Sequence, residues 1–95
     1  MKERVRIGDA SRPRLPRHVK FRFDETRQCW VVLAPERLLM PDEIAVEILK
    51  LCDGAATVGA IADVLAAKFA APRDLVGGDV VAMLQDLADK GVIEA

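Results

Sequence analysis

The spacing of apolar residues changes near Pro41, and this change constrains the fold more than any other feature of the sequence. Over residues 18–23, apolar and polar side chains alternate one by one, which is the pattern of a strand with one buried face. After Pro41, apolar residues recur every three or four positions, as they do along the buried face of a helix. The sequence therefore predicts a sheet first and helices after it.

The part of the chain before Pro41 predicts three short strands. The first covers residues 18–23, and the polar residues 24–28 form the hairpin loop that follows it. Residues 29–33 are almost wholly apolar and rich in β-forming side chains, so this strand is predicted to be the more buried partner. Residues 36–40 form a third, shorter strand that is limited by a proline on either side. The inward side of the first strand is predicted to carry Val19, Phe21 and Phe23.

Three helices are predicted after these strands. The first begins at Pro41 and ends at Gly54, which serves as its C-terminal cap. Thr57 is the N-cap of the second helix, which ends before Pro72. The third helix covers about residues 73–90. The inward stripes of the first two helices are predicted to include Ile44, Ile48, Leu49, Ile61, Leu65 and Phe69.

The start of the third helix is left open by the sequence. Gly77 and Gly78 lie within it, and two glycines inside a helix cost about 2 kcal/mol relative to alanines. Asp79 follows them directly and is a competent N-cap for a shorter helix. The helix can therefore begin before or after the glycine pair.

Three strands followed by three helices is the order of elements in a winged-helix-like domain. The predicted class is therefore α+β, with a three-stranded antiparallel sheet followed by three helices. The 95 residues of the chain suffice for one domain, which is assigned to residues 18–95. Residues 1–17 carry prolines and turn-forming residues and are predicted to form a flexible basic arm at the N-terminus.

Charge is distributed unevenly along the chain. Residues 1–20 carry seven basic and two acidic side chains, whereas the remaining residues carry seven basic and thirteen acidic ones. The net charge of −1 gives no overall attraction to nucleic acid or to a membrane. No apolar run approaches the ~20 residues of a membrane span, and the N-terminus lacks the apolar region of a signal peptide. We expect a cytoplasmic protein.

The sequence lacks the residue combinations that carry catalysis. His18 is the single histidine and Ser11 the only serine, and neither occurs in the context of a catalytic triad. Cys29 and Cys52 lie far apart without the spacing of a metal site, so they are expected to be buried, reduced thiols. No glycine-rich phosphate loop is present. The chain is predicted to be a binding protein rather than an enzyme, without metal or cofactor.

Several short phrases, taken in their order and spacing, resemble the PqqD family. They are Pro13-Arg14-Leu15, the strand pair 18–23 and 29–33, Leu38 to Pro41, Leu51-Cys52-Asp53-Gly54 with Thr57-Val58, and Asp79-Val80 with Gly91-Val92-Ile93. This resemblance covers most of the chain. It implies a recognition element that binds the precursor peptides of ribosomally made, modified natural products.

The resemblance also implies partners. The precursor would be PqqA, a short peptide whose Glu and Tyr become cross-linked in the biosynthesis of pyrroloquinoline quinone (PQQ). The enzyme would be PqqE, a radical SAM protein with iron–sulfur clusters, and this chain would present the peptide to it as a non-catalytic chaperone. Some relatives are fused to a neighbouring pathway enzyme, and the sequence leaves open whether this chain is. It also leaves open the orientation of the peptide and a monomeric or weakly dimeric state.

The third strand and the third helix together suggest where a peptide would bind. An edge strand carries unpaired N–H and C=O groups with which an extended peptide can pair. The helix would form the second wall of a groove, in which flexible Met side chains adapt to different partners. The candidate peptide-binding residues are Arg37, Leu38, Leu39, Met40, Val80, Met83, Leu84 and Leu87. Alternatively the apolar ones fill the core, which is the favoured interpretation for Leu84 and Leu87.

Two other functions are compatible with this order of elements. A winged-helix protein would bind DNA, but residues 73–90 hold two basic and four acidic side chains, which phosphates repel. A protein–protein adaptor would dock to an enzyme without contacting the peptide, and the basic arm would then be its docking element. An adaptor would use the same surfaces, so the sequence does not exclude it.

Overall fold

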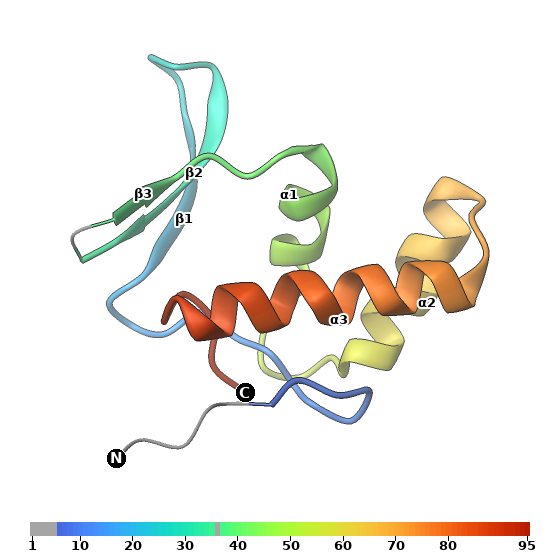
Figure 1. Cartoon of the computed structure of the whole chain (residues 1–95). Coiled ribbons are helices and arrows are strands. Elements are labelled where there is room, and N and C mark those ends of the chain that lie inside the picture. The colour runs from blue at the N-terminus through green and yellow to red at the C-terminus, as the bar shows by residue number, and fades with distance from the viewer. Residues whose placement is uncertain (1–5, 36) are drawn as a thin grey trace.

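The computed structural model describes residues 6–35 and 37–95 and places a small sheet beside three helices (Figure 1). The strands are β1 (Lys20–Asp24), β2 (Cys29–Ala34) and β3 (Arg37–Leu39). The helices are α1 (Glu43–Lys50), α2 (Val58–Phe69) and α3 (Arg73–Asp89). The sheet is antiparallel in the order β1-β2-β3, and α3 runs from the side of α2 toward the sheet. The predicted α+β architecture is therefore confirmed. No helix of the described residues is long and apolar enough to cross a membrane.

One face of the sheet packs against the helices. Phe21, Val32 and Leu39 stand opposite one another across the three strands, so their side chains share that face. Val32 belongs to the core, and the other two pack against it. The predicted inward side of the first strand is confirmed: Val19 is buried, and Phe21 and Phe23 share the face that carries Trp30 and Val32. Phe23 is nevertheless 43% exposed because the hairpin extends beyond the helices, and its ring lies edge-on to Trp30.

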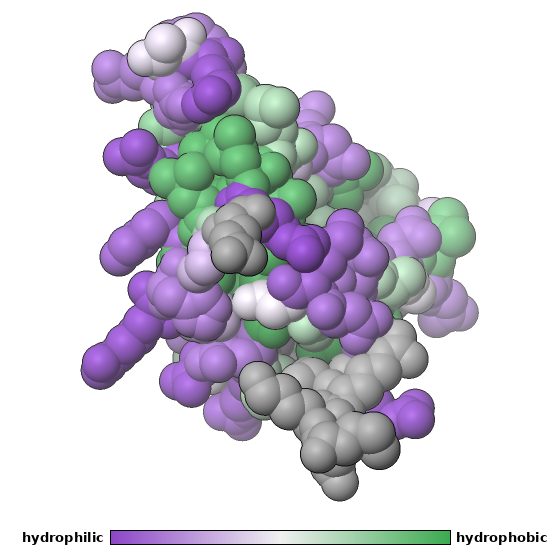
Figure 2. Space-filling view, turned by 60° about the vertical axis from the view of Figure 1, so that its left-hand side comes forward, coloured by the Kyte–Doolittle hydropathy of each residue, from purple (hydrophilic) through white to green (hydrophobic). Residues whose placement is uncertain are grey.

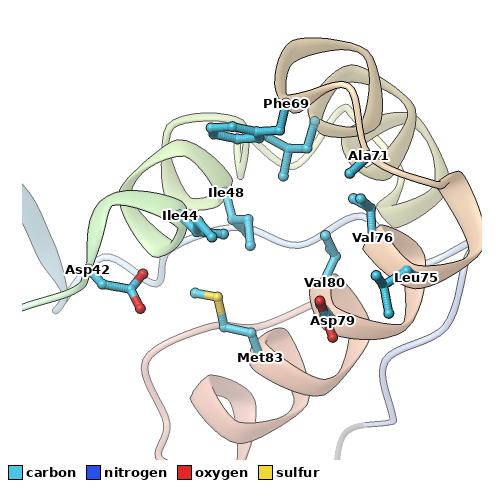
Figure 3. A pocket seen from close by; sticks show the side chains of 11 residues that line it. Asp42, Ile44, Ile48, Phe69, Ala71, Leu75, Val76, Asp79, Val80 and Met83 are labelled. Atoms are coloured by element: carbon cyan, nitrogen blue, oxygen red, sulfur yellow. The ribbon is translucent and has the colours of Figure 1, made fainter.

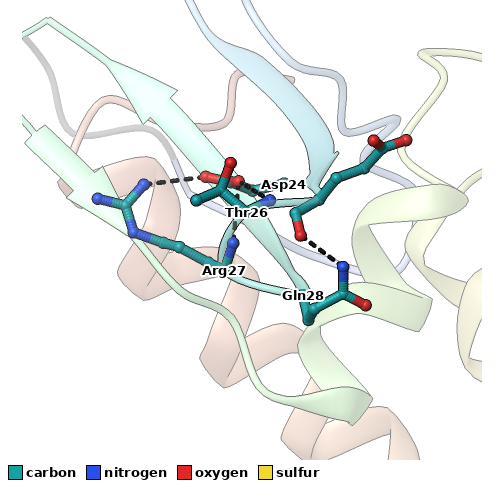
Figure 4. Close-up of polar contacts among 5 residues, drawn as sticks. Asp24, Thr26, Arg27 and Gln28 are labelled. Carbon is teal, nitrogen blue, oxygen red and sulfur yellow. Dashed lines mark hydrogen bonds and ion pairs between the residues drawn. The ribbon is translucent and has the colours of Figure 1, made fainter.

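The β1–β2 hairpin is held by polar contacts of its own (Figure 4). The Asp24 carboxylate accepts hydrogen bonds from the backbone N–H groups of Thr26 and Arg27, at 2.9 and 3.2 Å, and pairs with the Arg27 guanidinium at 2.9 Å. The bonds from the backbone and side chain of Arg27 lower the pKa of Asp24. Gln28 closes the turn with a left-handed backbone and donates from its side chain to the carbonyl of Glu25. The loop predicted over residues 24–28 is confirmed.

The first helix is shorter than predicted. Asp42 is its N-cap, accepting a hydrogen bond from the Ala45 N–H at 2.8 Å, and the helix ends at Lys50. The predicted end at Gly54 is wrong because Asp53 and Gly54 form the connection to α2 instead. The Asp53 carboxylate accepts from the N–H groups of the next turn, and Gly54 takes the left-handed backbone that a glycine tolerates. The predicted bounds of α2 are confirmed, since Thr57 caps its start and the helix stops at Phe69.

The third helix is continuous through the glycine pair. It begins at Arg73, whose guanidinium pairs with Asp63 of α2 at 2.5 Å and also donates to the carbonyl of Gly59. Gly77 lies under this guanidinium, where a β-carbon would collide with it, whereas a β-carbon at Gly78 would meet open space. Gly77 thus makes room for Arg73, which joins α2 to α3, whereas Gly78 has no such neighbour.

The segment before β1 is part of the folded domain. Ile7 and Pro13 are buried, and the carbonyls of Ser11 and Pro13 accept hydrogen bonds from the backbone of Val58 and Gly54. Arg14 exchanges two backbone hydrogen bonds with Glu94, at 2.8 and 2.9 Å. The sequence predicted a flexible arm over residues 1–17, whereas residues 7–17 pack and hydrogen-bond against the rest of the domain. The part of that prediction that concerns residues 1–5 lies outside the described residues.

The two glycines of α3 provide a matched test of the Arg73 contact. We predict that Gly78→Ala raises the free energy of unfolding by about 0.5–1 kcal/mol, because alanine favours the helix and the new methyl group is unobstructed. Gly77→Ala should gain clearly less, because its methyl group must displace the guanidinium of Arg73. Urea unfolding followed by circular dichroism measures both. Equal gains would mean that Gly77 has no steric role.

Candidate peptide-binding cleft

A cleft of about 380 Å³ lies between the sheet and α3, and we call it the strand cleft. Its floor is apolar and includes Val32 and Leu49 from the core. Its accessible walls come from the end of β3 and from the C-terminal half of α3. The wall residues are Leu39, Met40, Met83, Asp86, Leu87 and Lys90. Asp86 and Lys90 pair with each other across one helical turn at 2.9 Å, and Asp42 is the third charged residue of the lining, so the cleft is apolar mainly at its floor.

The strand cleft brings together four of the eight residues that the sequence predicted for the site. Leu39 and Met40 lie on the strand side, and Met83 and Leu87 lie on the helix side. Met40 is the most exposed of them, and Leu87 is nearly buried. Two flexible methionines therefore face the cleft from opposite walls, where they can adjust to the shape of an inserted side chain.

The other four predicted residues lie elsewhere. Leu84 is buried in the core, and Leu87 belongs to the core cluster as well as to the cleft wall, so the core interpretation that was favoured for these two holds. Val80 is also buried, and it lines the second cleft described below. Leu38 pairs with Leu33 on the opposite face of the sheet, because successive side chains of a strand point to opposite sides. It therefore does not line the cleft with Leu39. Arg37 is exposed at the start of β3, outside the strand cleft. Glu36, the first residue of the predicted strand, lies outside the described residues.

The far edge of β3 is free in the described part of the chain. The strand pairs with β2 on one side, and it is the last strand in the sheet order. Alternate N–H and C=O groups of an edge strand point outward, so they can pair with another extended chain. Figure 2, which brings this end of the molecule forward, shows apolar surface next to the polar β1–β2 hairpin.

A second cleft, of about 410 Å³, continues from the first, and we call it the helix cleft (Figure 3). It lies between α1, the end of α2 and the first turns of α3. Asp42 and Met83 line both clefts, so the two are contiguous. Sequence reasoning missed this surface because Ile44 and Phe69 fall at helical spacing and were assigned to the core, yet both are exposed. Leu75, also exposed, had no assignment.

The charged groups of the described residues lie at or near the surface. The described residues include no buried charged residue and no cluster of three or more groups able to hold a metal ion. Burial, with a smaller effect of the neighbouring Asp53 charge, raises the pKa of the Cys52 thiol to about 12. That thiol stays protonated at neutral pH and is a poor nucleophile. Cys29 is partly exposed, so the expectation that both thiols are buried holds for Cys52 alone.

The sequence of this chain is similar to that of known proteins over most of its length. Residues 29–93 match the protein family described as Coenzyme PQQ synthesis protein D (PqqD). The chain is also 67% identical over 89 residues to the PqqA binding protein of Rhodopseudomonas palustris strain BisB5, covering 94% of this chain and 87% of that one. The chain belongs to the PqqD family. The family resemblance stated from the sequence is therefore confirmed.

Two solved structures of PqqD proteins share the fold. The solution structure of the PqqD truncation of Methylobacterium extorquens PqqCD has a TM-score of 0.83 and 42% identity, covering 99% of this chain and 100% of that one. It is described as a functional, stand-alone recognition element for ribosomally synthesised, post-translationally modified peptides. The crystal structure of PqqD from Xanthomonas campestris has a TM-score of 0.60 and 34% identity, covering 94% of this chain and 99% of that one. These relatives are a binding protein and a recognition element, in agreement with the prediction that this PqqD-family chain is not an enzyme.

The two thiols give a chemical test of the fold. We predict that iodoacetamide at pH 8 labels Cys29 of the native protein much faster than Cys52, because Cys52 is buried and its pKa is raised. Both should react at similar rates in urea. Mass spectrometry of proteolytic fragments measures the two rates. Equal labelling of the native protein would contradict the burial of Cys52.

Proposed function

We propose that this PqqD-family chain binds the precursor peptide PqqA and presents it to the radical SAM enzyme PqqE. The name of its relative from Rhodopseudomonas, PqqA binding protein, supports the choice of peptide. The observation that carries the proposal is the free edge of β3 beside an apolar cleft. A strand edge offers hydrogen bonds to any extended peptide, and the cleft selects among peptides by their side chains.

The peptide adds to the sheet as a fourth strand next to β3. Its N–H and C=O groups pair with those that the edge of β3 points outward. Side chains alternate along the added strand, so every second one faces α3 and enters the strand cleft. There it contacts Met40, Met83 and Leu87, while its neighbours face the side of the sheet that carries Leu38. The cleft therefore favours a peptide with apolar residues at alternate positions.

Presentation to PqqE requires that the bound peptide stay accessible at its reacting part. An added strand meets this need, because only the paired segment is held and the rest of the peptide leaves the sheet edge. The described residues supply no catalytic group, so the covalent chemistry takes place on the enzyme. In this proposal the PqqD-family chain contributes affinity and position. The DNA-binding alternative has no support among the reported relatives, which are described by peptide binding and recognition.

Met40 tests the position of the peptide. It is exposed and lies outside any helix, so Met40→Glu should fold normally. It lines the strand cleft but not the helix cleft. We predict that this variant binds synthetic PqqA about tenfold or more weakly, because a carboxylate in an apolar cleft loses hydration. Isothermal titration calorimetry measures the affinity, and circular dichroism verifies the fold.

Val64→Glu is the matched control, since Val64 is a large exposed apolar residue of α2 that lines neither cleft. It should bind PqqA as the wild type does. A folded Met40→Glu variant with unchanged affinity would contradict the proposed site. Pairing with β3 has a separate test, in which N-methylation of alternate amides of the peptide should abolish binding at one set of positions and spare the other.

A further inference from the structure

The helix cleft has the features of a binding surface rather than of a packing defect. Ile44 is 55% exposed, Phe69 41% and Leu75 61%, although each is a large apolar side chain. They surround a single cavity of about 410 Å³ instead of being scattered over the surface. In Figure 3, side chains of α1 and Phe69 face those of the first turns of α3 across the opening. Large exposed apolar groups around one hollow are typical of a site that another molecule covers.

The position of the helix cleft indicates which molecule covers it. The chain passes from β3 through Met40 and Pro41 to Asp42, which lines the strand cleft and the helix cleft alike. A peptide strand paired with β3 and extending past Met40 therefore arrives over α1 and the first half of α3. Met83 lies at the same end of the helix cleft as Asp42, so its side chain contacts whatever crosses from one cleft to the other. The two clefts form one continuous path.

The charge of the helix cleft restricts the sequence of its occupant. Its charged lining residues are Asp42 and Asp79, and no basic side chain lines it. The Asp42 carboxylate caps α1 through one oxygen, which leaves the negative charge at the opening of the cleft. An apolar side chain next to a lysine or arginine matches this surface, whereas one next to a carboxylate would be repelled.

We infer that the helix cleft is a second subsite for the precursor peptide, separate from strand pairing at β3. It takes a large apolar or aromatic side chain from the segment that adjoins the paired strand on the Met40 side, with a basic residue of the peptide beside Asp42 and Asp79. The inference rests on the proposed function, since it assumes that the peptide pairs with β3. It adds a determinant of specificity that a three-residue strand does not provide.

Leu75 is the residue to change, because it lines the helix cleft but not the strand cleft. Leu75→Glu should weaken the binding of synthetic PqqA about tenfold, since it places a carboxylate where an apolar side chain of the peptide is buried. Val64→Glu, at an exposed apolar residue of α2 that lines neither cleft, should leave the affinity unchanged. Asp79→Asn should weaken binding and reduce its dependence on salt. Asp74→Asn, on the same helix but outside both clefts, should do neither.

A second measurement uses the unaltered protein. In a complex with isotope-labelled protein, an apolar or aromatic side chain of PqqA should show nuclear Overhauser effects to the methyl groups of Ile44 and Leu75. Shortening the peptide from the end that passes Met40 should remove these signals and reduce the affinity to that of Leu75→Glu. Shortening it from the other end should leave the signals in place.

The outcomes separate the inference from the proposed function. If Met40→Glu loses affinity while Leu75→Glu binds like Val64→Glu and the methyl signals are absent, the second subsite does not exist and pairing at β3 stands. If Leu75→Glu loses affinity and Met40→Glu does not, the peptide occupies the helix cleft without pairing at β3. That result would overturn both the proposed pairing at β3 and the second subsite that assumes it. Loss in both variants, with methyl signals from one peptide side chain, supports the inference.

Discussion

The burial of one face of α3 is the interaction on which the rest of the structure depends. Val80 and Leu84 of this helix are almost completely inaccessible and belong to the same cluster as Val32 of the sheet and Ile61 of α2. Because side chains three and four residues apart share a helix face, the residues one position before or after them point toward the rim of the core. Met83 and Asp79 are such residues. The packing that holds the sheet against the helices thus also aims the polar and adaptable side chains of α3 into the two clefts.

A free strand edge is a hazard as well as an opportunity, since it can pair with a second copy of the same chain. The edge of β3 is limited to three residues, and Pro35 and Pro41 flank it closely. Proline has no N–H to donate, so a long self-associating ladder cannot extend past either one. A short edge gives little affinity by backbone pairing alone. Side-chain contacts in the neighbouring clefts are needed to make such an edge selective.

Local patterns were sufficient to predict the elements and their order. The two hydrophobic periods separated sheet from helices, and cap residues such as Thr57 marked helix ends, because these signals depend on a few neighbouring residues. Half of the predicted site residues lie together for the same reason. Leu39, Met40, Met83 and Leu87 line one cleft, whereas placing Leu38 required knowing which face of a three-residue strand points inward. That choice depends on the register with β2 rather than on the alternation within β3.

Features that depend on distant parts of the chain were not predictable from local patterns. The exposure of Ile44 and Phe69 follows from the way α1, α2 and α3 meet, and helical spacing alone cannot distinguish the wall of a cleft from a core. Prolines near the N-terminus suggested a free arm, yet Pro13 is buried under the α1–α2 connection. Helix propensity alone makes Gly77 unfavourable within α3, and its steric role beneath Arg73 depends on the packing of α3 against α2.

The backbone pairing of Arg14 with Glu94 has a consequence for synthesis on the ribosome. Translation proceeds from the N-terminus, so Arg14 emerges long before its backbone partner Glu94, whereas the partners of Ser11 and Pro13 emerge in between. The ribosomal exit tunnel still encloses Glu94 for a time after that residue has been added to the chain. The pairing of Arg14 with Glu94 therefore forms only once Glu94 has left the tunnel, and a nascent chain that has not yet reached this point lacks the closure.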